Sequence, residues 1–181
     1  MRSHTALVII DAQVAIIGSP DVYDGDAVLR RIASLLAAAR AAGTPIFFVQ
    51  HDHATFLPLM PGHPGWEIHP AIAPKPGELV IRKRASDAFY ATSLRSELDR
   101  LGVTRLVVAG CQTEYCVDTS VRRALSLDYD VLLVADGHTT TDGDLLSAPH
   151  IIAHHNAMLA GLPHPTREIR VRPADEIAFV S

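Results

Sequence analysis

Asp11, Lys83 and Cys116 are three residues whose types together can cleave an acyl bond. Asp11 directly follows one short apolar run, Lys83 lies two positions after another, and Cys116 lies in the first turn of a helical pattern after a third. A thiol is mostly protonated at neutral pH, and it attacks well only when a base removes its proton or a positive charge stabilises the thiolate. Asp11 can accept the proton, and the charge of Lys83 can lower the pKa of the thiol. The three residues therefore indicate nucleophilic catalysis by Cys116.

Short apolar runs alternate with helical patterns along the chain and predict the elements that position these residues. Continuous apolar runs are typical of strands covered on both faces, as in a parallel sheet. Strands are predicted at residues 6–10, 45–49, 79–81, 106–109, 131–135 and 169–171. Helices are predicted at residues 26–42, 92–101, 114–127 and 148–159, the last two with Thr113 and Ser147 as N-cap residues. This alternation predicts one domain over residues 1–181, with an α/β fold built as a three-layer α/β/α sandwich, Rossmann-like, around a mainly parallel six-stranded sheet.

The predicted fold also indicates where a site lies. In open parallel sheets the ligand binds beyond the carboxyl ends of the strands. Asp11, Lys83 and Cys116 all stand at such ends, so we expect them to meet at one edge of the sheet. There the start of a helix would favour the Cys116 thiolate, and its free N–H groups would hold an oxyanion. Residues 51–77 contain six prolines and no clear periodicity, which indicates a functional loop that shapes the pocket.

Each of the three residues also has an ordinary structural interpretation. A helical cysteine is commonly a small buried apolar residue, an aspartate after a strand is commonly a turn residue, and Lys83 between two arginines fits a solvated strand. A non-enzymatic protein with this fold is therefore an alternative. Three such polar residues at one edge would be a poor choice for packing alone, which favours an enzyme.

Residues 116–122 also fit the Cys-x5-Arg signature of tyrosine phosphatases. That chemistry needs the five intervening residues wrapped around a phosphate, which normally requires glycine. The segment contains no glycine, and the spacing of Val117 and Val121 indicates a helix with an Asp118–Arg122 pair one turn apart. The phosphatase is therefore the less favoured alternative.

Composition and charge argue against several other classes of protein. The 181 residues are 48% hydrophobic with a net charge of −4, and no run of like charges extends beyond residues 82–84, so neither nucleic acid nor a membrane is an expected partner. The sequence contains neither a glycine-rich dinucleotide turn after the first strand nor the Gly-x-Ser-x-Gly motif of serine hydrolases. Two cysteines cannot form a disulfide framework, and the apolar run before Asp11 is too short for a signal peptide, so we expect a cytoplasmic protein.

Three segments, in order along the chain, resemble the motifs of the isochorismatase-like cysteine hydrolases. Residues 8–13 are similar to that family's strand followed by Asp-x-Gln, and residues 80–89 are similar to its lysine segment, with Phe89 six positions after Lys83. Residues 110–117 resemble its nucleophile segment, Gly-x-x-Thr-x-x-Cys-Val. The resemblance covers nearly the whole chain and points to the general cysteine-hydrolase branch, which is related to the nicotinamidases and N-carbamoylsarcosine amidase.

The resemblance implies a role for each matched residue. Cys116 would be the nucleophile, Asp11 the proton acceptor and Lys83 the electrostatic partner. The Cys111–Gln112 peptide bond would be cis, and the backbone N–H groups of Gln112 and Cys116 would form the oxyanion hole, with Cys111 as a packing residue. The resemblance also implies the strand order 3-2-1-4-5-6 and a homo-oligomer, either a dimer or a tetramer.

The implied reaction is hydrolysis of a small-molecule amide or related C–N bond through a thioester on Cys116. The alternative is ether cleavage of the isochorismatase type, which needs no thiol. Nicotinamidases hold a divalent metal with an Asp-x-His motif and a further histidine, and residues 51–53 lack that spacing, so we expect no metal and no other cofactor. Whether His51, Asp52 and His53 bind substrate or a metal is left open by the sequence. The candidate substrate-binding residues are Gln13, His51, Trp66, Phe89, Tyr115 and His155.

Overall fold

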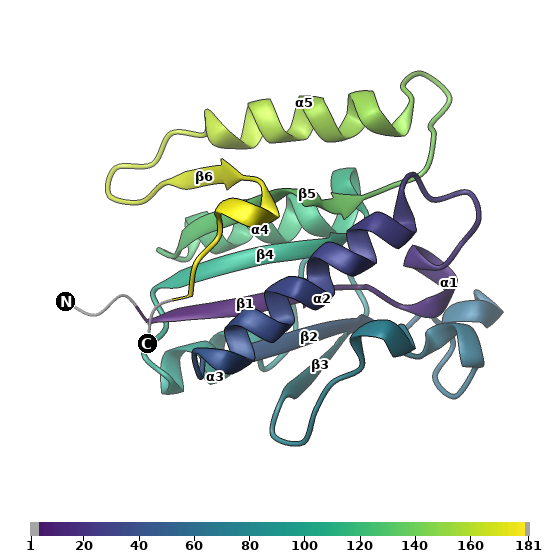
Figure 1. Cartoon of the computed structure of the whole chain (residues 1–181), viewed down its shortest axis with the longest axis horizontal. Coiled ribbons are helices and arrows are strands. Elements are labelled where there is room, and N and C mark those ends of the chain that lie inside the picture. The colour runs from purple at the N-terminus through teal and green to yellow at the C-terminus, as the bar shows by residue number, and fades with distance from the viewer. Residues whose placement is uncertain (1–3, 180–181) are drawn as a thin grey trace.

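Six strands form one sheet in the order β3-β2-β1-β4-β5-β6, and every neighbouring pair is parallel (Figure 1). The computed structural model describes residues 4–179 of the chain. The strands are β1 (Thr5–Ile10), β2 (Ile46–His51), β3 (Leu79–Lys83), β4 (Arg105–Cys111), β5 (Asp130–Thr139) and β6 (Ile169–Arg172). Both the α/β fold class and the strand order predicted from the sequence are confirmed.

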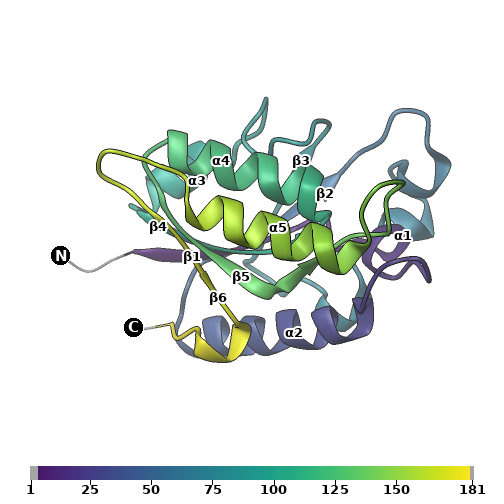
Figure 2. The ribbon, with the colours of Figure 1, turned by 90° about the horizontal axis from the view of Figure 1, so that it is seen from above.

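Helices cover both faces of this sheet and bury its side chains in two apolar layers (Figure 2). One face carries α2 (Gly25–Ala41), and the other carries α3 (Leu94–Arg100), α4 (Asp118–Ser126) and α5 (Ala148–Ala160). Successive residues of a strand point to opposite faces. Val8 and Ile10 of β1 accordingly pack in the layer under α3 and α4, whereas Leu7 and Ile9 pack against α2. None of the helices in residues 4–179 is long and apolar enough to cross a membrane.

The segment that follows β4 differs from the single helix predicted at residues 114–127. Residues Thr113–Val117 form a π-helical turn, and α4 begins only at Asp118. The prediction of Thr113 as an N-cap is wrong, because its hydroxyl contacts the ring of His138 at 2.8 Å instead of a backbone N–H group. Ser147 does occupy the N-cap position of α5, but its hydroxyl contacts His150 rather than the helix backbone.

The loop between β2 and β3 is more ordered than its proline content suggests. It contains three short 3-10 helices, Leu57–Leu59, Pro64–Trp66 and Pro70–Ile72, each with a proline at its first or second position. Proline suits that position because its fixed φ matches the helix and its missing N–H group has no helical partner there.

A further short helix outside this loop, α1 (Val14–Ile17), follows the end of β1 and was not predicted.

Strands β1 and β4 approach each other closely at the carboxyl edge of the sheet. Gly110 has a φ of 130°, and a Cβ atom there would lie 2.0 Å from the carbonyl oxygen of Ile10. Only glycine tolerates such a conformation and such an approach. Asp11, the first residue after β1, also adopts a left-handed conformation, with a φ of 48°. The backbone therefore turns sharply both after β1 and near the end of β4, where the candidate site begins.

Candidate active site

Lys83 and Asp11 form a buried ion pair across the carboxyl edge of the sheet. The Nζ atom of Lys83 lies 2.7 Å from Oδ2 of Asp11, and the two side chains are 0% and 2% exposed. The alternation of β3 explains why a lysine from an edge strand points inward: Ile81 and Lys83 are buried, whereas Val80 and Arg82 are exposed. Lys83 thus shares the core-facing side of its strand with Ile81.

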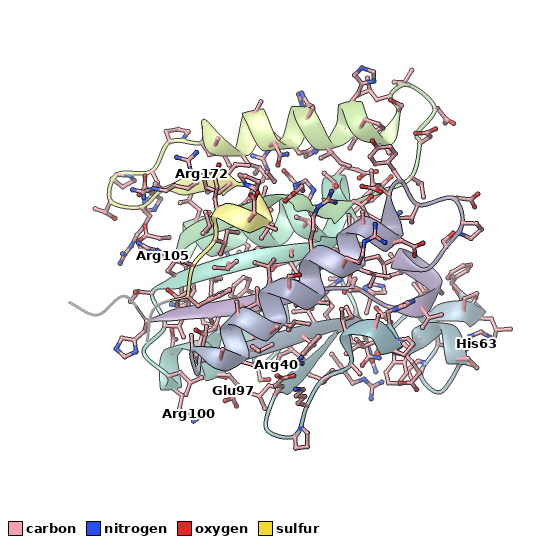
Figure 3. All side chains as sticks on the ribbon, in the orientation of Figure 1. Arg40, His63, Glu97, Arg100, Arg105 and Arg172 are labelled. Carbon is pink, nitrogen blue, oxygen red and sulfur yellow. The ribbon has the colours of Figure 1, made fainter. Side chains whose placement is uncertain are left out.

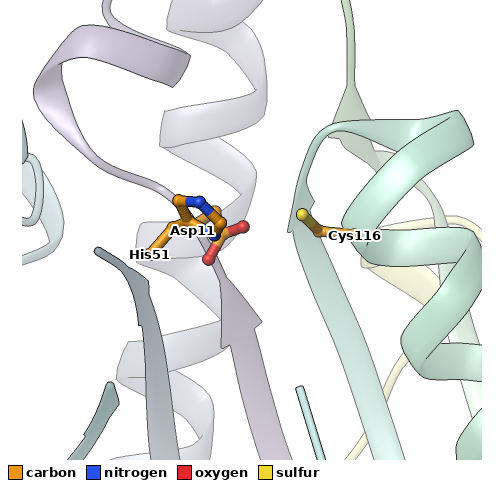
Figure 4. Close-up of side chains that lie close together, drawn as sticks. All are labelled: Asp11, His51 and Cys116. Atoms are coloured by element: carbon orange, nitrogen blue, oxygen red, sulfur yellow. The ribbon is translucent and has the colours of Figure 1, made fainter. Parts of the chain in front are cut away.

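Cys116 approaches this ion pair from the opposite side, on the π-helical turn. Its Sγ atom lies 3.1 Å from Nζ of Lys83. Figure 4 shows the sulfur directed across the gap towards Asp11 and His51. Ligand atoms of Asp11, His51 and Cys116 all lie within 4.8 Å of one another. The structure therefore brings together the three residues that the sequence analysis selected as a candidate triad.

The ammonium group of Lys83 has two further neighbours. Its Nζ atom lies 3.0 Å from the carbonyl oxygen of Ala85 and 3.1 Å from Nδ1 of His51. An ammonium group can only donate, so Nδ1 of His51 must be the acceptor and Nε2 must carry the proton of the neutral ring. Burial, followed by the charge of Lys83, lowers the pKa of His51, which agrees with a neutral ring. Lys83 is thus surrounded by acceptors.

The environment of Cys116 keeps its thiol protonated in the resting site. Burial, followed by the nearby Asp11 carboxylate, raises the pKa of the Cys116 thiol to about 12, although Lys83 acts in the opposite direction. For Lys83, burial alone would lower the pKa, but Asp11 and Cys116 outweigh it and raise the pKa above its usual value. Lys83 thus lowers the pKa of the thiol, the direction expected from its charge, but burial and the Asp11 carboxylate outweigh this contribution.

Asp11 keeps one oxygen available for proton transfer. Its Oδ2 atom is paired with Lys83, whereas Oδ1 is buried and has no hydrogen-bond partner among residues 4–179. A buried carboxylate oxygen without a donor is costly, and such atoms call for an explanation. The thiol proton of Cys116 and groups of a bound substrate are the donors that this position can receive.

Gln13 and Trp66 organise the loop beside the triad. Both donors of the Gln13 amide are used, on the carbonyl oxygens of His51 and Trp66, at 3.0 and 2.7 Å, and its Oε1 atom accepts from the N–H group of His51 at 2.8 Å. The Trp66 indole donates to Asp52 at 2.9 Å. Gln13 therefore holds the start of the loop, and its polar atoms are engaged by the protein.

Phe89, Tyr115 and His155, three other candidate substrate-binding residues, do not gather at the triad. Phe89 stacks on Tyr129 with the ring centroids 6.1 Å apart. Tyr115 is 56% exposed on the π-helical turn, and His155 on α5 contacts the carbonyl oxygen of Ile151 at 2.8 Å. Within residues 4–179, none of these three side chains forms a hydrogen bond, ion pair or ring contact with the side chain of Asp11, Lys83 or Cys116. Cys111 is buried, and the peptide bond that follows it is cis.

A buried network that the sequence analysis missed holds the π-helical turn. The Thr113 hydroxyl contacts Nδ1 of His138 at 2.8 Å, and Nε2 of His138 contacts Oδ1 of Asn156 at 2.9 Å. Burial lowers the pKa of His138 to about 4, so the ring is neutral at physiological pH. Asn156 Oδ1 can only accept, so Nε2 donates to it and Nδ1 accepts from Thr113. No local signal in the sequence marked this network, because the strand was predicted to end at residue 135, before His138.

The geometry of residues 116–122 does not suit a phosphatase. Thr113–Val117 and α4 wind the segment as a helix rather than as a phosphate-binding loop. The Nε atom of Arg122 lies 2.8 Å from Oδ2 of Asp118, one turn earlier. Arg122 is therefore engaged on the flank of α4, as the helical interpretation predicts.

Asp11, His51 and Cys116 are also the group of side chains with the spacing to hold a metal ion in the described part of the chain. Lys83 occupies the position that such an ion would need, because its Nζ atom lies 2.7 Å from Asp11, 3.1 Å from His51 and 3.1 Å from Cys116. The ammonium group already supplies a positive charge to all three ligands. The donor set therefore does not fit a metal while Lys83 holds this place.

Comparison with known proteins agrees with this fold. The family model of the isochorismatase domain matches residues 5–158. Streptothricin hydrolase from Streptomyces noursei is 41% identical over 147 residues, which are 81% of this chain but 52% of that protein, so the chain spans about half the length of that relative. The isochorismatase family protein YddQ of Bacillus subtilis is 33% identical over 168 residues, which cover 87% of this chain and 91% of that protein.

Another relative and two solved structures extend the comparison. The ureidoacrylate amidohydrolase RutB of Methylobacterium radiotolerans is 31% identical over 170 residues, 73% of this chain and 66% of that protein. The crystal structure of an isochorismatase family protein has a TM-score of 0.83 at 36% identity, covering 93% of this chain and 99% of the other. An isochorismatase from Pseudomonas putida has a TM-score of 0.87 at 33% identity, covering 97% and 90%. With one family model over most of its length and relatives above 30% identity, the chain belongs to the isochorismatase family.

Proposed function

We propose that the chain hydrolyses a small-molecule amide or related C–N bond through a thioester on Cys116. The observation that carries this proposal is the position of Lys83, whose Nζ atom contacts both Oδ2 of Asp11 and Sγ of Cys116 inside the protein. Two relatives carry names that support this reaction class, streptothricin hydrolase and ureidoacrylate amidohydrolase. Ether cleavage of the isochorismatase type needs no thiol and would leave the Lys83–Cys116 contact without a role.

The first half of the proposed reaction forms the thioester. Asp11 accepts the thiol proton as the sulfur of Cys116 attacks the substrate carbonyl carbon. The backbone N–H groups of Gln112 and Cys116 hold the oxyanion of the tetrahedral intermediate. Asp11 then returns the proton to the leaving amine, the C–N bond breaks, and the acyl group remains on the sulfur. Lys83 stabilises the negative charge, first on Asp11 and then on the thiolate.

The second half of the proposed reaction restores the enzyme. Water enters where the amine has left, and Asp11 removes its proton as the oxygen attacks the thioester carbon. The C–S bond breaks, the carboxylic acid is released, and the sulfur regains its proton. Burial and the Asp11 carboxylate raise the pKa of the Cys116 thiol in the free site, so we expect the proton to move from the sulfur to Asp11 when the substrate is attacked.

The thioester can be tested directly. Purified protein is screened for ammonia or amine release on a panel of small amides, and any reaction that turns over is quenched in acid during the steady state. We expect a peptide that contains Cys116 to carry the mass of the substrate acyl group, and hydroxylamine to release that group as a hydroxamate. Turnover of an amide with no acyl adduct on Cys116, under conditions in which a slower thioester substrate does give one, would contradict the proposal.

Chelation tests the role of Lys83 as the cation of the site. We expect prolonged dialysis against EDTA and 1,10-phenanthroline to leave the rate of amide hydrolysis unchanged, because the ammonium group fills the position among Asp11, His51 and Cys116. Metal content measured before and after dialysis is the control. Loss of activity that returns on adding zinc, iron or manganese would show that His51 serves a metal.

A further inference from the structure

A cavity of about 630 Å³ opens at the carboxyl ends of β2 and β3, next to the candidate triad. His51 and Ala85 line this cavity, and both also contact Nζ of Lys83, at 3.1 and 3.0 Å. The cavity and the triad therefore share a wall.

The charged side chains that line the cavity leave one positive charge without a partner. The carboxylate of Asp52 is held by Arg82 at 2.7 Å and by the Trp66 indole at 2.9 Å, so its charge is compensated. Arg84 also lines the cavity, and among residues 4–179 no carboxylate pairs with its guanidinium group. Since Lys83 is paired with Asp11, Arg84 supplies the excess charge of this space.

Two histidine rings in the cavity wall are also fixed as donors. Nδ1 of His51 accepts from Lys83, so its proton is on Nε2. Nδ1 of His53 accepts from the backbone N–H groups of Thr55 and Phe56, at 3.2 and 2.9 Å, which places the proton of that ring on Nε2 as well. The cavity lining therefore contains two imidazole rings protonated on Nε2 and one guanidinium group, while the lining carboxylate, that of Asp52, is already engaged.

We infer that this cavity binds the anionic end of the substrate, a carboxylate, and that Arg84 is the residue that selects it. The guanidinium group presents paired N–H donors that match the two oxygens of a carboxylate, and an ammonium group cannot do the same. This inference rests on the proposed function, because it takes Cys116 as the reacting group. The preferred substrates are then small amides with a carboxylate at the end away from the scissile bond.

Labelling of Cys116 with a matched pair of reagents tests the inference without requiring turnover. 3-Maleimidopropionate carries a carboxylate, and N-propylmaleimide is a neutral reagent of similar size. Rates of labelling at Cys116 are measured by mass spectrometry for the native protein and for Arg84→Gln. We expect the ratio of the anionic to the neutral rate to fall by about tenfold or more in the variant, because a charge-assisted contact is lost. The rate with N-propylmaleimide should change less than about twofold, which also reports an intact site.

Arg105→Gln is the matched control, because it removes the same charge at the amino end of β4. Figure 3 shows Arg105 far from His63, which marks the loop between β2 and β3. We expect this variant to keep the native ratio and Arg84→Lys to give an intermediate ratio. An unchanged ratio in Arg84→Gln would overturn the inference, whether or not the protein hydrolyses amides.

Turnover supplies the second arm of the test. The kcat/KM for succinamate is compared with that for 4-oxopentanamide, in which a methyl group replaces one carboxylate oxygen. We expect succinamate to be preferred by the native protein and the preference to be lost in Arg84→Gln, chiefly through KM. If neither amide reacts while the labelling ratio still depends on Arg84, the proposed reaction is at fault and the anion site stands.

Discussion

Replacing Cys116 with alanine is expected to abolish amide hydrolysis, with a loss in kcat on the order of 10⁶-fold, the size found when other hydrolases lose their nucleophile. No other thiol can substitute, because Cys111 is 0% exposed and burial raises its pKa well above the usual range. Hydrolysis is measured as ammonia release on the best amide of the panel. The substitution removes only the sulfur atom of a half-buried side chain, so the circular dichroism spectrum of Cys116→Ala should match that of the native protein.

Cys111→Ala is the matched control for the nucleophile. It removes the same atom from a residue five positions earlier, and we expect it to keep most of the native kcat. Iodoacetamide should label Cys116 first in the native protein, since Cys116 is half-buried and Cys111 is fully buried. Faster labelling of Cys111, or hydrolysis that survives in Cys116→Ala, would rule out Cys116 as the nucleophile.

The sequence predicted the elements that the hydrophobic pattern alone determines. The buried run of β1 ends in Asp11 because apolar side chains are required only while the strand lies under helices on both faces. Parallel strands end on one edge, so Asp11, Lys83 and Cys116 could be expected to meet there without any knowledge of their contacts. What the pattern could not supply was the 2.7 Å approach of Lys83 to Asp11, because periodicity indicates the face a side chain takes and not its distance from a partner on another strand.

The hydrophobic pattern does not predict polar networks, because the partners in such networks are distant in the sequence. β5 continues to Thr139, past the apolar run that predicted its end at residue 135, and its buried His138 contacts Thr113 of the π-helical turn. Thr113 was predicted as a cap for its residue type, but its hydroxyl instead satisfies His138, 25 positions away. Hydrogen bonds of this kind decide the last turn before Cys116, and no local signal predicts them.

The sequence also does not predict the proposed role of Arg84 in binding a carboxylate. Arg82, Lys83 and Arg84 are a basic triplet in the sequence, and their types do not distinguish them. The structure gives each a different partner: Arg82 pairs with Asp52, Lys83 pairs with Asp11, and Arg84 faces the cavity with no carboxylate among residues 4–179. Strand alternation and the path of the loop between β2 and β3 produce this difference.

Lys83→Met is expected to damage both catalysis and stability, because it leaves the Asp11 carboxylate buried without its cation. Breaking one side of a buried ion pair costs about 3–5 kcal/mol. We expect a fall of that size in the free energy of unfolding, measured with urea, and a loss of at least about 10²-fold in kcat.

Asp11→Asn should lose at least about 10²-fold in kcat as well, since an amide cannot accept the thiol proton.

The double variant Lys83→Met/Asp11→Asn separates the two effects. Replacing both members of a buried ion pair by uncharged groups of similar volume is often neutral for stability, so we expect the free energy of unfolding to return to within about 1 kcal/mol of the native value. Catalysis should stay at the level of the worse single variant, because the losses of residues that act as one unit do not add. A double variant as unstable as Lys83→Met would mean that Lys83 contributes through packing of its aliphatic stem, and additive losses in kcat would mean that Asp11 and Lys83 act on the reaction independently. Recovery of stability without recovery of hydrolysis is the result that a catalytic ion pair requires, since the charges are then needed for the reaction and not for the fold.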